Sequence, residues 1–273
     1  MASTHTSDVD VLMSVLSAMA VRRQNQTDDP LVTTQRPTTT LKEILEKIRA
    51  NQDQIRELDL KDMAAKKRKL RSSGGDLVAR VFQLNHTVKR LLLPGHEIGD
   101  VGATSMGNML RANNTLAHLD LRGNEITVQG VRALSDALYG HEALEYLCIS
   151  SNQVGNEGAK ALAKVLPFNG SLKSIDLANN EIGEEGGSAL LEAVLQNRSL
   201  VRLRLVQNDI PQDILDKIRA ALVVNKLMQK KVKRDETKSR QTGDKGDEAS
   251  ENMGEQESDS SSDNEEEDES LWI

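Results

Sequence analysis

One phrase recurs in this chain at a fixed interval, and the recurrence constrains the fold more than any other feature. Four leucines open the pattern L-x-x-L-x-L-x-x-N-x-I, with occasional Ile or Val, and each follows the last by 28 residues: Leu116, Leu144, Leu172 and Leu200. Val88 opens a copy 28 residues earlier, and Ile55 opens a degenerate copy 33 residues before that. A fixed period of this length is typical of a solenoid, whose repeats pack only on their neighbours. We therefore expect about five to six stacked repeats of 28 residues.

Each repeat contains one strand and one helix. The segment x-L-x-L-x alternates between apolar and polar residues, which predicts a short strand with one buried face. Apolar residues between the phrases recur at helical spacing, as do Val131, Leu134 and Leu138. An Asn follows four of the strands, and its amide is expected to satisfy backbone groups at the turn and to bond along the stack: Asn124, Asn152, Asn180 and Asn208. His96 holds this position in the Val88 repeat, and we interpret it as a structural substitute.

This unit resembles the ribonuclease-inhibitor class of leucine-rich repeats over residues 55–210. The resemblance implies an α/β fold, a right-handed leucine-rich-repeat solenoid with a parallel concave sheet and convex helices. Helices are expected to cap both ends, because terminal repeats would otherwise expose their cores. Thr40 and Glu43 form a capping box that opens a helix over 41–51. Pro211 suits the first turn of a second amphipathic helix.

The order of elements also resembles the leucine-rich domain of tropomodulin and leiomodin, over residues 40–234. The matching segments are TLKEILEKIRANQ, IRELDL, NHTVKRLLL and a last helix that runs into Asn225, Lys226 and KKVKR. This resemblance implies a non-catalytic intracellular scaffold or adaptor, with actin or another cytoskeletal protein as its partner. The alternative is a GTPase-activating or GTPase-regulating protein, because Ran GTPase-activating proteins also combine such repeats with an acidic tail, although they are longer.

Composition divides the chain into three regions. Residues 40–225 should form the repeat domain with its capping helices, and residues 1–39 a mostly disordered segment with a short helix over 9–21. Residues 226–273 should form a basic and then acidic disordered tail. Between Asp247 and Glu269 there are twelve Asp or Glu and no Lys or Arg, so the rest of the chain carries about +5, which is -7 minus -12. Candidate features of this tail are the phosphosites Ser260 and Ser262 and a docking peptide, Leu271, Trp272 and Ile273.

Several classes of function find no support in the sequence. We identify no P-loop, metal-ligand cluster, nucleophile elbow or dinucleotide turn, so we expect neither an enzyme nor a cofactor or metal. The basic clusters Lys66–Arg71 and Lys230–Arg234 lack interleaved aromatic residues, which argues against nucleic-acid binding. They are interpreted as solvated segments, as nuclear-localisation signals or as patches that contact an anionic partner. The single cysteine and the absence of a spanning segment favour a cytoplasmic monomer, associated with the cytoskeleton or, alternatively, nuclear.

Strand alternation assigns a candidate binding surface to the concave face of the sheet. Repeat proteins commonly bind there, and Tyr and Arg dominate many interfaces. The alternative is a solvated face of mixed charge. Cys148 is expected on the same face as an inert small residue. The candidate partner-binding residues are Arg90, His118, Asp120, Arg122, Tyr146, Asp176, Arg202 and Arg204.

Overall fold

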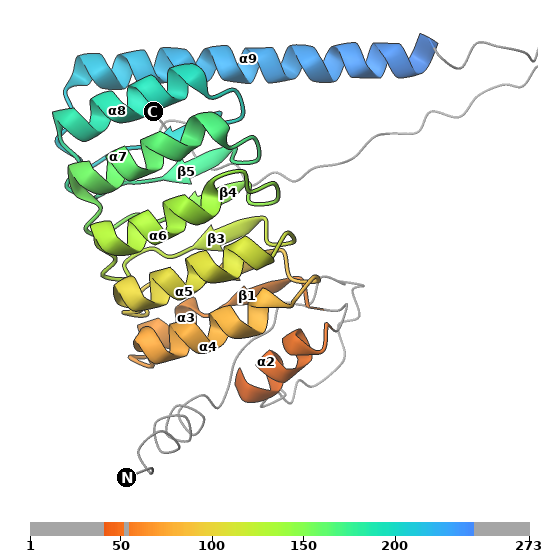
Figure 1. Cartoon of the computed structure of the whole chain (residues 1–273), viewed down its shortest axis with the longest axis vertical. Helices are drawn as coiled ribbons and strands as arrows, with labels where there is room; N and C mark the ends of the chain where they lie inside the picture. The colour runs from red at the N-terminus through yellow and green to blue at the C-terminus, as the bar shows by residue number, and fades with distance from the viewer. Residues whose placement is uncertain (1–40, 52–54, 243–273) are drawn as a thin grey trace, which may run out of the picture.

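The computed structural model describes residues 41–51 and 55–242. Within these ranges the chain forms a six-stranded parallel sheet whose strands follow one another in chain order. Helices alternate with the strands and stack beside one another, from α2 at one end to α9 at the other (Figure 1). The sheet does not close, and the expected α/β leucine-rich-repeat solenoid is confirmed.

The strands are short and the helices longer. The strands are β1 (Glu57–Asp59), β2 (Arg90–Leu92), β3 (His118–Asp120), β4 (Tyr146–Cys148), β5 (Ser174–Asp176) and β6 (Arg202–Arg204). The helices are α2 (Leu41–Arg49), α3 (Lys61–Ala65), α4 (Arg71–Gln83), α5 (Gly99–Ala112), α6 (Val128–Leu138), α7 (Gly155–Val165), the 3-10 turn η1 (Leu166–Phe168), α8 (Glu184–Gln196) and α9 (Gln212–Thr242).

The core runs along the whole stack as rows of equivalent residues. The middle residue of each strand is buried, and in register it faces the middle residue of the next strand: Leu58, Leu91, Leu119, Leu147, Ile175 and Leu203. Apolar residues of the convex helices, such as Met106 in α5 and Leu134 in α6, pack behind them. Because each repeat buries its apolar face on its neighbours, the core is one continuous cluster.

Helices α5 to α8 pack closely because each has a glycine near its start, on the packed face. A Cβ atom at Gly130 would lie 2.7 Å from Cγ2 of Ile126 and 2.8 Å from Cβ of Ala103. The equivalent glycines are equally crowded by a branched side chain four residues earlier: Gly102, Gly158 and Gly186. The glycine positions in the sequence therefore reflect close packing, as the repeat pattern indicates.

The Asn residues that follow the strands form a ladder along the stack. In each step the side-chain oxygen accepts the backbone N–H of the residue 28 positions earlier, as Oδ1 of Asn180 does from Asn152 at 3.1 Å. The side-chain N–H groups donate to strand-end carbonyls, such as that of Ile149 at 2.9 Å. The ladder comprises Asn124, Asn152, Asn180 and Asn208, and it begins on the backbone of His96.

His96 substitutes for Asn at the start of this ladder. Its ring is buried, its Nε2 lies 3.0 Å from the carbonyl of Leu60, and its Nδ1 accepts the N–H of Leu70. Burial is the main cause that lowers the pKa of His96, so the ring is neutral at neutral pH. A neutral imidazole can bridge the wider gap that the insertion between β1 and β2 creates. The interpretation of His96 as a structural substitute is consistent with these contacts.

A second ladder joins the other ends of the strands. Side-chain amides at the helix-to-strand junctions donate to carbonyls 28 and 31 residues earlier, as Asn197 does to Asn169 and Leu166. The buried members are Asn85, Asn113, His141, Asn169, Asn197 and Asn225, each 28 residues after the last. Four of these residues begin N-x-S/T triplets and are structural junctions, since their side chains are buried and hydrogen-bonded: Asn85, Asn113, Asn169 and Asn197.

Helices α2 and α9 cap the two ends. Helix α2 buries Ile44 and Ile48, and the carbonyl of Ile48 accepts a hydrogen bond from Asn85. It ends at Arg49, two residues before the expected end, and Thr40 of the capping box lies outside the described residues. Helix α9 buries Ile218 and Leu222 and joins the second ladder through Asn225.

The tail was expected to begin at residue 226, and this boundary is wrong. Helix α9 continues to Thr242, so the basic cluster Lys230–Arg234 is helical. Residues 235–242 are polar and rich in helix-forming Lys, Arg, Glu and Gln, which favours continuation without an apolar face. The other basic cluster, Lys66–Arg71, is also part of the fold, because Leu70 is buried and Lys69 is ion-paired with Glu97.

Several expectations concern residues outside the described ranges. These are the N-terminal segment 1–39 with its helix over 9–21, the phosphosites Ser260 and Ser262, and the docking peptide Leu271, Trp272 and Ile273. None of the helices that the structure describes is long and apolar enough to cross a membrane.

Candidate functional site

The eight predicted binding residues lie on one face of the sheet, seven of them in two adjacent rows. The first row crosses the strand starts, where register pairs Arg90, His118, Tyr146, Ser174 and Arg202 in turn. The second row crosses the strand ends and contains Leu92, Asp120, Cys148, Asp176 and Arg204. Arg122 lies just beyond β3 and reaches over the second row. These side chains flank the buried middle residues of the strands, and their role in binding stays a prediction.

An aromatic stack occupies the middle of the first row. The rings of His118 and Tyr146 lie face to face, with centroids 4.0 Å apart and planes inclined by 15°. Burial is the main cause that lowers the pKa of His118 to about 4, and the charge of Arg90 contributes to this shift. The imidazole is therefore neutral at neutral pH and stacks without a charge to desolvate. This half-buried pair presents an uncharged surface between the flanking residues of its row.

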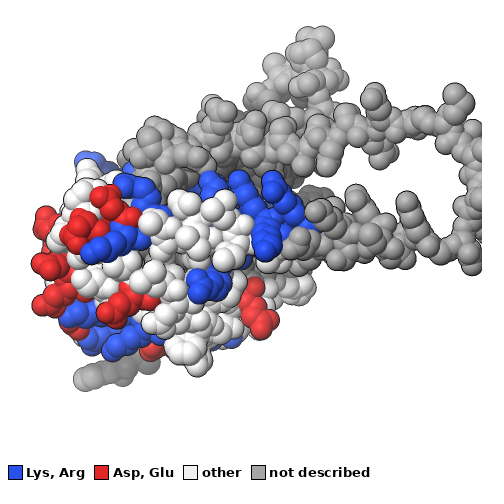
Figure 2. Space-filling view, turned by 90° about the horizontal axis from the view of Figure 1, so that it is seen from above, with Lys and Arg blue, Asp and Glu red and all other residues white. Residues whose placement is uncertain are grey.

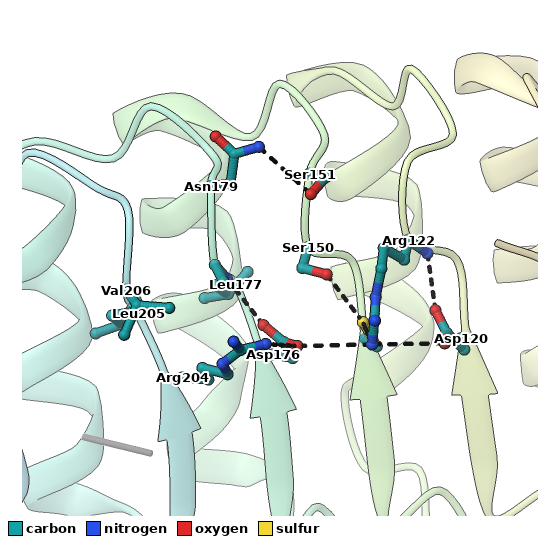
Figure 3. A network of polar contacts seen from close by, with 12 residues as sticks. Asp120, Arg122, Ser150, Ser151, Asp176, Leu177, Asn179, Arg204, Leu205 and Val206 are labelled. Carbon is teal, nitrogen blue, oxygen red and sulfur yellow. Dashed lines mark hydrogen bonds and ion pairs between the residues drawn. The ribbon is translucent and has the colours of Figure 1, made fainter. Parts of the chain in front are cut away.

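A charge network joins the strand ends around Asp176 (Figure 3). Oδ2 of this buried carboxylate lies 3.2 Å from Nη1 of Arg204 and 3.9 Å from Nη2 of Arg122. Arg122 also lies 3.8 Å from Oδ2 of Asp120, and its backbone N–H donates to Oδ1 of that residue. Burial raises the pKa of Asp120, although the bonds to Arg122 oppose the rise. The network fixes the direction of both arginine side chains.

Cys148 lies beneath this network, and its thiol is unreactive. Its Sγ is 3.6 Å from Nη2 of Arg122 and 3.3 Å from Oγ of Ser150. Burial raises the pKa of the Cys148 thiol to about 12, and the charges of Asp120 and Asp176 add to the rise. The group therefore stays protonated at neutral pH, which makes it a poor nucleophile and supports the interpretation as an inert small residue.

The structure adds contacts that the sequence pattern did not predict. Nε of Arg90 lies 2.9 Å from Oε2 of Glu57 in the preceding repeat. Within the described residues, Oγ of Ser174 and Nε of Arg204 are buried and have no hydrogen-bond partner. The repeat pattern places Glu57 beside Arg90, but it does not show which side-chain atoms meet. Ser174 was placed on this face by alternation but was not among the candidates, since nothing in the sequence shows that its hydroxyl stays unpaired.

No metal site is evident in this surface. Among residues 41–51 and 55–242, no three His, Cys, Asp or Glu side chains gather in a way that could hold a metal ion. The carboxylates of the face, Asp120 and Asp176, are instead neutralised by arginine. The arrangement is suited to contact with a polar surface that offers apolar groups to the stack and hydrogen-bonding groups to its flanks.

Comparisons with known proteins agree with this architecture. Residues 112–135, 143–163 and 168–191 match the family described as Leucine Rich repeat. A search of curated proteins found no significant match.

Two solved structures share the arrangement. The structure titled Leiomodin-1 Actin-Binding Site 2 (ABS2) aligns with 75% of this chain and 98% of its own, at 19% identity and a TM-score of 0.50. The tropomodulin C-terminal domain from Caenorhabditis elegans aligns with 72% of this chain and 98% of its own, at 13% identity and a TM-score of 0.46. The described residues therefore have a leucine-rich-repeat fold, which the leiomodin structure shares.

Proposed function

We propose that this chain is a non-catalytic scaffold or adaptor that binds a protein partner on the concave face of its sheet. The observation that carries the proposal is the stack of His118 and Tyr146 in the middle of the first row, with Arg90 and Arg202 on the same row. Aromatic and arginine side chains held in fixed positions are common centres of protein interfaces, because little side-chain entropy is lost on binding.

The buried polar atoms of the face support the same proposal. Buried polar atoms without a hydrogen bond are rare in native proteins and require an explanation. Oγ of Ser174 and Nε of Arg204 are such atoms among the described residues, although Nη1 of Arg204 is paired with Asp176. Both atoms are closed to solvent, so a partner at β5 and β6 would supply their hydrogen bonds by turning these side chains outward.

The class of partner that we propose is actin or an actin-associated protein. The support is the resemblance in fold to the leiomodin domain, which its title describes as an actin-binding site. The chain would then act at the cytoskeleton. The concave residues proposed to carry the contact are Arg90, His118, Asp120, Arg122, Tyr146, Asp176, Arg202 and Arg204.

Direct binding to purified actin tests both parts of the proposal. The full chain would be titrated against monomeric actin by calorimetry and sedimented with filaments. We expect binding to at least one form, and we expect Arg202→Glu to weaken it at least about tenfold, as at a hot-spot residue. Arg198→Glu is the matched control, because Arg198 is exposed, lies in the same repeat and is outside the concave rows. It should change the Kd by less than about twofold.

Each part of the proposal can fail separately. Lack of binding to either form of actin would remove actin as the partner. Binding that Arg202→Glu leaves unchanged would move the contact away from the concave face. Stimulated GTP hydrolysis in a panel of small GTPases would instead favour the GTPase-regulating alternative.

A further inference from the structure

The capping helix α9 presents an apolar stripe on the side that faces away from the repeats. Its inner side is buried through Ile218, Leu222 and Asn225. On the opposite side, apolar residues three and four positions apart have exposed fractions between 45% and 61%: Val223, Val224, Leu227 and Met228. The terminal element of a solenoid normally has a polar outer face. An exposed cluster of this kind on a cap marks a surface that another segment covers.

Charge is distributed unevenly along this outer side. The described ion pairs of α9, Lys217 with Asp213 and Arg219 with Asp216, lie before the apolar stripe. After the stripe come the exposed basic residues Lys230, Lys231 and Arg234. Seen from above, the helix shows mixed charge, then an uncharged patch, then Lys and Arg (Figure 2). The segment that covers the stripe should therefore carry both apolar and acidic residues.

The chain itself contains a segment with this composition in the required order. We propose that residues 247–273 fold back along α9, so that the acidic run from Asp247 to Glu269 lies against the basic end and Leu271, Trp272 and Ile273 cover the apolar stripe. On α9 the apolar residues precede the basic ones, whereas in the tail the acidic residues precede the apolar ones. A chain that reverses direction after Thr242 therefore brings opposite charges together first and apolar groups together next.

The length of the connection fits this return. From Thr242 back to residue 225 is 17 residues, which is about 25 Å along a helix at 1.5 Å per residue. A random coil of 28 residues, the number from 243 to 270, would have an end-to-end distance of about 30 Å. A linker whose length matches its span gives an effective concentration of about 1 mM. Contacts with a Kd of about 0.1 mM would then keep the tail docked about nine-tenths of the time.

The proposal does not depend on the proposed function of the concave face, because it concerns a different surface. It gives the acidic run and the Leu-Trp-Ile triplet one shared role. It also implies that any partner of the outer side of α9 must first displace the tail.

Tryptophan fluorescence tests the proposal, because Trp272 is the only tryptophan of the chain. The full chain is measured by emission wavelength and by acrylamide quenching, with the same chain in urea as the solvated reference. We expect emission at shorter wavelength and several-fold weaker quenching in the folded chain. Val224→Glu with Leu227→Glu should return both values to the reference. A second variant, Lys230→Glu with Lys231→Glu, changes only exposed basic residues and should have the same effect.

The control is Leu195→Glu, which introduces the same charge at an exposed apolar residue of α8. It should leave the fluorescence of Trp272 unchanged, and circular dichroism should show that all variants keep their helix content. A tryptophan that is as solvated in the folded chain as in urea would overturn the proposal. So would protection that survives the Val224→Glu and Leu227→Glu change. Protection that rises with protein concentration would assign the stripe to a second copy of the chain instead.

Discussion

Removal of one ladder amide should destabilise the solenoid according to how deeply that amide is buried. In Asn180→Ala, the backbone N–H groups of Asn152 and Val154 lose their shared acceptor, Oδ1 of Asn180, at 3.1 and 3.4 Å. The carbonyls of Ile149 and Ala178 lose a donor at 2.9 and 3.1 Å. The Asn180 side chain is fully buried, with an exposed fraction of 0%. Water therefore cannot replace these bonds without opening the stack.

The magnitude follows from the number of donors left unpaired. Each buried N–H without a partner costs about 1–3 kcal/mol, so two give about 2–6 kcal/mol. Asn208 makes the same kinds of bond, with acceptor distances of 3.0 Å from Asn180 and Ile182, but it is only partly buried. Water can hydrate its partners, so Asn208→Ala should cost only about 1 kcal/mol. The two substitutions are chemically identical and differ mainly in burial.

Urea unfolding followed by circular dichroism measures both values, and thermal unfolding supplies a check. For a domain of this size, about 3 kcal/mol corresponds to a fall in Tm of about 6–12 °C, against about 2–4 °C for Asn208→Ala. Equal losses for the two variants would refute the reasoning, because burial would then not determine the cost. A loss below about 1 kcal/mol for Asn180→Ala would show that the ladder contributes little to stability.

Two further predictions concern the stack and the helix packing. The pKa of His118 is lowered to about 4 in the folded chain, against about 6.5 in the unfolded chain. Between these two pH values the unfolded chain binds more protons than the folded chain. The free energy of unfolding therefore falls as the pH drops from about 6.5 to about 4. His118→Phe keeps an aromatic ring against Tyr146 but cannot bind a proton. It should therefore reduce the loss of unfolding free energy between pH 7 and pH 5, measured by urea titration. An unchanged loss would show that His118 is not the group responsible for the pH dependence. Gly130→Ala places a Cβ within 2.7 Å of Asp100 and Ile126, so it should destabilise the fold by about 1–3 kcal/mol through overpacking. A Tm equal to that of the unaltered chain would show that α5 and α6 can separate freely.

The repeat pattern was sufficient to predict the strands and the rows that they form. In x-L-x-L-x the leucines must point into the core, so the residues between them must point out, and a constant period aligns equivalent residues on neighbouring strands. This is why the placement of Tyr146 and Arg202 on the concave face could be derived without coordinates. Periodicity also located the convex helices, since their apolar residues recur at helical spacing.

Other features depend on contacts that no local pattern encodes. Whether Cys148 is reactive depends on its burial and on the carboxylates of Asp120 and Asp176 on the neighbouring strands, which together raise the pKa of its thiol. The extent of α9 was missed because residues 235–242 lack an apolar stripe, and helix propensity alone continues the helix. The second ladder was concealed by a change of residue type, since His141 takes the place of Asn and Asn225 lies in a helix rather than at a strand.

The two ladders make the molecule modular in a strict sense. Side-chain bonds of each kind join residues whose numbers differ by the same interval from one repeat to the next: 28 for the backbone N–H of Asn152, 28 for the carbonyl of Asn169 and 31 for the carbonyl of Leu166. A gene duplication or deletion that spans one whole unit would therefore reconnect each amide to an equivalent partner, without new contacts having to evolve. An insertion of another length must be accommodated outside the ladder positions. The spacing of 33 residues between Ile55 and Val88 is of this kind, and His96, which replaces Asn in that repeat, bonds to the carbonyl of Leu60.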